Sequence, residues 1–190
     1  MEYMGNADWW NKRFHERSLS LMIHDKKLEE DGSRFHSGGR VLDLACGDGR
    51  NSIYLAEQGY LVDAIDFSAE ALSRLKYFAD ELKLQIETLL VDLTLEQPFD
   101  HMKEYDLIII NHYRLNKTCY RDLSSHMKER GVLWVNGFRE VPIDNPRITD
   151  KDLLTEEDFE HLVNFTLDDK EMYDEGNHKM VRYIWRKQSV

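Results

Sequence analysis

An aspartate and two glycines stand where one apolar run gives way to an amphipathic one. Asp43 lies inside the run VLDLA, and Gly47 and Gly49 follow directly. Glycine lets the backbone approach a ligand closely and adopt a positive φ. A helix beginning near Arg50 would direct free backbone N–H groups at the same place, which suits a carboxylate or a phosphate. The pattern therefore predicts a ligand-binding turn between a strand and a helix.

Two more acids follow apolar runs further along the chain. Asp66 ends the run YLVDAID. In nucleotide-binding folds, the carboxylate that binds a ribose diol follows the glycine turn by about 20 residues, and Asp66 lies close to that spacing. Asp92 follows the next apolar run, where it could accept a hydrogen bond from the amine of an adenine between Phe67 and Leu93. Each acid also has a structural alternative. Asp43 could be a surface turn residue, Asp66 a helix cap and Asp92 the start of an Asx turn.

Two ligand classes are candidates for such a turn. A dinucleotide requires GxGxxG or GxGxxA, and here Ser52 holds the third small position. Asp43 and Asp48 would also repel a pyrophosphate unless they point away from it. S-adenosylmethionine carries no phosphate, and its sulfonium and ammonium groups are attracted by acids. Three acids in chain order therefore predict S-adenosylmethionine rather than a dinucleotide.

Alternating strands and helices are expected to position these residues. Strands are predicted at 40–46, 60–66, 85–93, 105–113 and 131–138, and helices at 50–59, 68–82 and 117–129. Residues 8–31 predict one helix or two, with Asp8 as the cap. Thr155 begins a further helix with Asp158 as its capping-box partner, and the segments 163–173 and 178–187 flank the turn DEGN. We therefore predict an α/β Rossmann-like fold whose seven-stranded, mainly parallel sheet has helices on both faces and a C-terminal antiparallel hairpin.

Composition predicts one compact domain. With 190 residues and 42% hydrophobic content, the chain is expected to form a helical cap segment over 1–37 and a ligand-binding domain over 38–190. Its net charge of -11 disfavours nucleic acid and anionic membranes as partners. Cys46 and Cys119 form no CxxC pair, so we predict no metal site and a reducing, cytoplasmic location. No signal-peptide pattern and no apolar run of about 20 residues is found.

These motifs resemble those of the class I S-adenosylmethionine-dependent methyltransferases. VLDLACGDGRNS resembles their first motif, VDAIDFSAEAL the acidic second, VDL the third, and YDLIIINHYRL the fourth strand and its exit. The resemblance extends over residues 38–187. Within the class, the stretch with GRNS after the turn most resembles the tellurite-resistance methyltransferase branch. Ala45 departs from the glycine that is more usual at its position.

The resemblance implies a set of cofactor contacts. The turn would hold the methionine end, Asp66 the ribose, Phe67 the adenine face, Asp92 and Leu93 the adenine edge, and Asn111 would lie beside the methionyl group. The residues implied in the turn are Asp43, Ala45, Cys46, Gly47 and Gly49.

Methyl transfer is an in-line displacement, so the protein mainly positions donor and acceptor. His112 and Tyr113 follow the fourth strand and are the candidate catalytic residues, with His112 as a base near neutral pH. His112 could instead be a strand-end histidine with a backbone partner. A thiolate, selenium or tellurium acceptor would need no base.

Two segments are expected to cover the acceptor side: the N-terminal helix with Trp9, Trp10 and Phe14, and the loop 139–154. The tryptophan pair could equally serve packing. Arg114 and Arg139 could steer an anionic acceptor or form surface ion pairs.

The sequence thus predicts an S-adenosylmethionine-dependent methyltransferase acting on a small molecule, with S-adenosylhomocysteine as product. A thiol, a chalcogen oxyanion or another small nucleophile would be the acceptor. The alternatives are a non-catalytic S-adenosylmethionine-binding regulatory or partner subunit and a dinucleotide oxidoreductase. The oligomeric state is not predicted.

Overall fold

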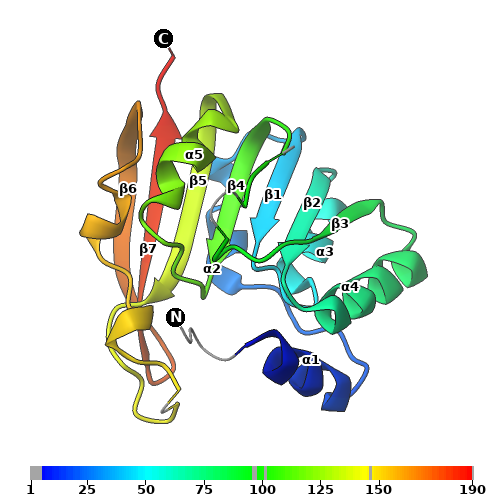
Figure 1. The fold of residues 1–190 in the computed structure, drawn as a ribbon. Coiled ribbons are helices and arrows are strands. Elements are labelled where there is room, and N and C mark those ends of the chain that lie inside the picture. The colour runs from blue at the N-terminus through cyan, green and yellow to red at the C-terminus, as the bar shows by residue number, and fades with distance from the viewer. Residues whose placement is uncertain (1–5, 96–97, 101, 146, 190) are drawn as a thin grey trace.

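A seven-stranded sheet organises the molecule. The computed structural model describes residues 6–95, 98–100, 102–145 and 147–189. The strand order is β3-β2-β1-β4-β5-β7-β6, with β7 antiparallel to both neighbours and the other pairs parallel (Figure 1). The strands are β1 (Arg40–Leu44), β2 (Leu61–Asp66), β3 (Ile86–Leu90), β4 (Tyr105–Asn111), β5 (Met127–Phe138), β6 (Phe165–Glu175) and β7 (His178–Lys187). The predicted Rossmann-like fold and its C-terminal hairpin are confirmed.

Helices cover both faces of this sheet. They are α1 (Ala7–Glu16), α2 (Lys26–Glu30), α3 (Arg50–Glu57), α4 (Ala69–Leu82) and α5 (Cys119–Ser125), and the short 3-10 helices η1 (Gly32–Arg34), η2 (Asp150–Asp152) and η3 (Glu156–Phe159). Side chains alternate along a strand, so in β1 and β4 the odd positions, such as Val41 and Leu107, pack with Leu28 of α2 and Leu55 of α3. The even positions of these two strands, such as Leu42 and Ile108, pack under α5 and η3 on the opposite face.

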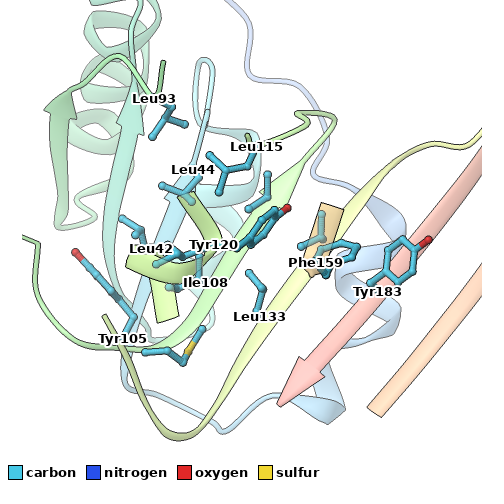
Figure 2. Close-up of a cluster of buried hydrophobic side chains, with 14 of the residues drawn as sticks. Leu42, Leu44, Leu93, Tyr105, Ile108, Leu115, Tyr120, Leu133, Phe159 and Tyr183 are labelled. Carbon is cyan, nitrogen blue, oxygen red and sulfur yellow. The ribbon is translucent and has the colours of Figure 1, made fainter. Parts of the chain in front are cut away.

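The core under α5 contains a row of aromatic rings. The ring centroids of Tyr120 and Phe159 lie 5.2 Å apart, and those of Phe159 and Tyr183 lie 4.8 Å apart. Figure 2 shows this row beside Leu42, Ile108 and other aliphatic side chains of the same cluster. The row joins the hairpin to the parallel part of the sheet.

Three local predictions need correction. The helix predicted at 117–129 covers only Cys119–Ser125, because β5 already begins at Met127, which pairs with Tyr105. The third strand ends at Leu90, so Asp92 lies in the turn beyond it. Helix α1 is capped by Asn6, whose side chain accepts from the Trp9 N–H, and not by Asp8.

Other local predictions are confirmed. Ser68 caps α4 by accepting from the Ala71 N–H. Thr155 and Asp158 form the expected capping box, although the helix that it starts is the 3-10 helix η3. Residues 8–31 contain two helices.

Residues 6–37 belong to two different parts of the fold. Helix α1 lies beyond the ends at which the parallel strands finish (Figure 1). In contrast, α2 and η1 belong to the core, since Leu28 is fully buried and Asp31 accepts a 2.9 Å hydrogen bond from the indole of Trp134. The buried Arg182 of β7 also forms an ion pair with Asp31.

Candidate functional site

A cavity of about 990 Å³ opens at the carboxyl ends of the parallel strands. The turn after β1 and the ends of β2, β3 and β4 line one side, its floor, and α1 lines the other side, its roof. Figure 1 shows α1 opposite these strand ends. All but one of the site residues predicted from the sequence line it: Asp43, Ala45, Cys46, Gly47, Asp66, Phe67, Asp92, Leu93, Asn111, His112 and Tyr113. The exception is Gly49.

Asp66 links the second strand to the glycine turn. One carboxylate oxygen accepts from the Gly47 N–H at 2.8 Å, and the other accepts from the Ser68 N–H at 2.9 Å. Burial raises the pKa of Asp66, and the backbone hydrogen bonds oppose that shift. Asp66 is thus fixed at the cavity wall, and each of its oxygens can accept one more hydrogen bond.

Asp43 is buried on the α3 side of β1, because strand alternation turns it away from the face that holds Leu42 and Leu44. Its carboxyl accepts a 2.6 Å hydrogen bond from Ser52 of α3. Burial raises its pKa from 3.8 to about 7, and the nearby Asp66 adds to the effect. Asp43 is therefore a carboxyl whose charge a cationic ligand would stabilise.

This raised pKa predicts how stability changes with pH. Between about pH 4 and pH 7 the folded Asp43 carboxyl holds a proton that the unfolded chain has released. The folded state then binds more protons, so the free energy of unfolding falls as the pH rises through this window. One pKa unit corresponds to about 1.4 kcal/mol, so Asp43 should lower the free energy of unfolding by a few kcal/mol across this window.

Urea unfolding at a series of pH values, with Asp43→Asn as the comparison, measures this contribution. The asparagine keeps an acceptor for Ser52 and does not titrate, so stability should fall less over the window in the variant than in the wild type. Equal slopes for the two proteins would show that Asp43 ionises normally in the folded state.

The turn after β1 holds three residues in the left-handed region. Ala45 has φ 57°, Gly47 57° and Gly49 85°. Glycine adopts these values without strain, whereas Ala45 carries a Cβ there. Gly49 is also the N-cap of α3, and a Cβ at this position would lie 2.1 Å from Leu75 Cδ1 of α4. Gly49 therefore serves the packing of the turn against α4 and does not line the cavity.

Asp48 does not stand unpaired in the turn. Its carboxylate forms 3.3 Å ion pairs with Arg74 of α4 and with Arg17, which follows α1. These two cations compensate its charge, so Asp48 no longer argues against a pyrophosphate. The case against a dinucleotide ligand therefore rests on Asp43 and on Ser52 at the third small position of the motif.

Asp92 forms the Asx turn that was one of its two predicted roles. Its Oδ1 accepts from the Thr94 N–H at 2.9 Å and from the Thr94 hydroxyl at 2.7 Å, which makes the Asx turn. It also lines the cavity, as do Phe67 and the buried Leu93.

The roof of the cavity consists of α1 and part of the loop 139–154, of which residue 146 lies outside the described residues. The guanidinium of Arg147 lies 4.6 Å from the ring centroid of Trp9, and Trp9 and Trp10 pack edge to face at 4.8 Å. Both tryptophans and Phe14 line the cavity. The loop and α1 therefore meet above the cavity, as the sequence predicted.

The two arginines considered for steering lie elsewhere. Arg114 forms a 2.6 Å ion pair with Asp158, and Arg139 pairs with Glu140 and with Asp174. Neither lines the cavity, so their ion-pair interpretation is confirmed.

A buried polar cluster behind the cavity was not predicted. Asp25, just before α2, accepts from Asn111 Nδ2 at 3.1 Å and from Asn136 Nδ2 at 3.5 Å, and its backbone N–H donates to Asn51 at 2.9 Å. Tyr173 of β6 donates to Asn136 Oδ1 at 2.9 Å. The sequence does carry a signal for part of this cluster, since the apolar runs LIII and LWV each end in an asparagine, at paired positions of β4 and β5.

His112 and Tyr113 follow β4 at the cavity wall. His112 has φ 56°, and its backbone N–H donates to the Asn136 carbonyl at 2.8 Å. Burial lowers the pKa of His112 to about 4, and Asp25 opposes the shift. Burial, with Asp92 nearby, raises the pKa of Tyr113. Neither side chain is therefore charged near neutral pH.

Within the described residues, no group of three or more His, Cys, Asp or Glu side chains is placed to hold a metal ion. No helix in the described ranges is both long and apolar enough to cross a membrane.

Comparison with known proteins identifies relatives. The family model described as "Tellurite resistance protein TehB" matches residues 4–138. A probable S-adenosyl-L-methionine-dependent methyltransferase TehB of Haemophilus influenzae is 29% identical over 129 residues, which cover 67% of this chain and 42% of that protein. The first three curated relatives are matched over only 42%, 34% and 56% of their own lengths.

Solved structures show the same fold. The crystal structure of TehB from Haemophilus influenzae aligns with a TM-score of 0.69 and 22% identity, covering 94% of this chain and 67% of that one. Magnesium protoporphyrin IX methyltransferase from Synechocystis, solved with bound S-adenosylmethionine, aligns with a TM-score of 0.68 and 18% identity over 96% and 95% of the two chains.

Proposed function

Because the chain belongs to the family of the tellurite resistance protein TehB, we propose that it binds S-adenosylmethionine and transfers the methyl group to a small molecule. One observation carries this proposal. Asp43, Asp66 and Asp92, from three successive strand ends, line the same cavity as the turn at Gly47. A buried carboxyl with a raised pKa suits a ligand that brings positive charge, as a sulfonium and an ammonium do.

The positions of the side chains support a set of proposed cofactor contacts. Asp66, held by Gly47 and Ser68, would accept from the two ribose hydroxyls. The turn from Asp43 through Ala45 and Cys46 to Gly47 would hold the methionine end, with Asn111 beside it. We propose Phe67 for the adenine face, and Asp92 and Leu93 for its edge.

The size of the cavity favours an enzyme over a non-catalytic binding subunit. Its volume of about 990 Å³, with α1 in place above it, lies at the upper end of the range of about 300–1,000 Å³ for small-molecule sites. Space for a donor and a small acceptor supports catalysis, whereas a roof packed onto the donor alone would favour a regulatory role. We propose a small-molecule acceptor and, from the two free cysteines, a cytoplasmic location.

A thermal-shift series tests the proposed cofactor. A ligand present at 100 times its Kd adds about 2.7 kcal/mol to the free energy of unfolding. S-adenosylmethionine and S-adenosylhomocysteine should therefore each raise the Tm, and NAD should not. A shift with NAD alone would overturn the proposal. Release of labelled S-adenosylhomocysteine in the presence of small thiols, phenols and amines then distinguishes an enzyme from a binding protein.

A further inference from the structure

Asp25 lies behind the cavity wall and faces His112. Its Oδ2 atom is 3.6 Å from His112 Nε2 and 3.7 Å from Arg50 Nη2. The side chain of Asp25 is almost completely buried, and its other oxygen accepts from the Lys27 N–H at the start of α2. It is the acidic partner found for Nε2 in the described part of the chain.

The Nε2 atom of His112 is itself buried and makes no hydrogen bond within the described residues. A ring nitrogen that turned its lone pair toward a carboxylate oxygen would be repelled by it. The arrangement therefore favours the tautomer with the proton on Nε2, and the lone pair is then on Nδ1. Nδ1, in contrast, is not one of the buried polar atoms that lack a hydrogen-bond partner in the described chain, and 31% of the His112 side chain is exposed.

The backbone also holds His112 in place. Its φ of 56° lies in the left-handed region, which a non-glycine residue keeps only when its surroundings enforce it. The bond from its N–H to the Asn136 carbonyl and the contact of its ring with Phe138, 5.3 Å between centroids, provide this support. Asn136 is also tied to Asp25 and Asn111, so one cluster fixes both the ring and the carboxylate.

We propose that Asp25 is a positioning residue, which holds the His112 proton on Nε2 so that the Nδ1 lone pair can take a proton from the methyl acceptor at the cavity wall. This inference rests on the proposed methyltransferase function and narrows its substrate class to a nucleophile that carries a proton, such as a hydroxyl, a thiol or an amine. An acceptor already present as an anion has no proton for His112 to take.

The proposed reaction moves one methyl group and one proton. The acceptor atom forms a bond to the donor methyl group while the carbon–sulfur bond breaks, and that electron pair stays on sulfur to give S-adenosylhomocysteine. The acceptor proton moves to Nδ1, and the imidazolium later releases it to solvent. Asp25 stabilises the imidazolium, whereas Arg50 of α3 and His178 of β7 disfavour it.

Nitrogen-15 NMR of the histidine rings in the ligand-free protein tests the tautomer directly. His112→Gln identifies the signal of His112 among the eight histidines. In the wild type we expect the proton on Nε2, and in Asp25→Asn a shift toward the other tautomer. A wild-type ring with its proton on Nδ1 would overturn the proposal, whether or not Asp25→Asn folds.

Kinetics test the acceptor side, with 2-mercaptoethanol, catechol and a primary amine as proton-bearing probes and iodide as a probe without a proton. For the proton-bearing probes, His112→Gln should lower kcat by about 100-fold or more, and Asp25→Asn should lower it at least roughly 10-fold with little change in KM. Asp31→Asn, which alters a buried carboxylate away from the cavity, should leave kcat unchanged and controls for loss of fold.

Failure of the proposed methyltransferase function and failure of the role proposed for Asp25 give different results. If the wild type binds no S-adenosylmethionine, or releases no S-adenosylhomocysteine with any probe, the proposed function fails, and the NMR result still decides the role of Asp25. If the wild type methylates only iodide, or if Asp25→Asn matches the wild type in both kcat and tautomer, the proposed function stands and this inference is overturned.

Discussion

Replacing Asp66 with alanine is expected to abolish the stabilisation that S-adenosylmethionine confers. Each hydrogen bond to a charged group contributes about 1.5–3 kcal/mol, so losing both proposed ribose contacts should raise the Kd by at least roughly 100-fold. The variant also leaves the N–H groups of Gly47 and Ser68 without their acceptor, which disturbs the turn itself. Isothermal titration calorimetry measures the Kd directly.

Asp63 provides a matched control in the same strand. It is buried three residues earlier in β2, where it accepts from Tyr105 and pairs with Arg40 and Lys103, and it does not line the cavity. Asp63→Asn should lower the Tm and leave the Kd unchanged. Asp66→Asn, which keeps the shape and one oxygen, should bind with intermediate affinity. Undiminished binding by Asp66→Ala would refute the ribose assignment.

Replacing Gly49 with alanine should destabilise the protein by more than about 3 kcal/mol. A left-handed backbone costs an L-residue about 1–2 kcal/mol, and overpacking a core costs about 1–3 kcal/mol more. Both penalties apply, because φ is 85° and the new Cβ would lie 2.1 Å from Leu75 Cδ1. Equilibrium unfolding in urea measures the change in the free energy of unfolding.

Gly47→Ala separates the two penalties. Gly47 has a φ of 57°, but a Cβ there would lie 3.4 Å from Phe14 Cζ, which is ordinary contact, so only the backbone cost applies. In a Leu75→Ala background, Gly49→Ala should likewise cost little more than the backbone term, because the clashing atoms are gone. Equal losses for Gly47→Ala and Gly49→Ala in the wild-type background would show that Leu75 is not the limiting contact.

The contrast between these glycines shows why position in a motif does not settle a residue's role. Both fit the ligand-binding turn that the sequence predicts, and both have a positive φ. Only the packing of α4 decides that Gly49 faces Leu75 while Gly47 faces the cavity. The role of Asp48 is likewise not settled by its place in the motif, because its ion-pair partners Arg17 and Arg74 come from two other parts of the chain.

The sequence by itself determined the sheet, its hairpin and the edge at which the site lies. These follow from local patterns: apolar runs of strand length, helix caps such as Ser68, and the turn DEGN. Parallel strands bring their carboxyl ends to one edge, so Asp43, Asp66 and Asp92 had to meet once the order of strands and helices was read correctly.

Only the tertiary structure decided which distant groups complete the site. Asp25 reaches Asn111 and His112 across more than 80 positions of the chain, and Arg147 contacts Trp9 above the cavity. No periodicity in the sequence specifies such pairs, because they depend on where α1 and α2 pack against the finished sheet. The part of the cavity proposed to hold the methyl donor can therefore be predicted from local sequence, whereas the part proposed to hold the acceptor depends on contacts between segments that are far apart in the chain.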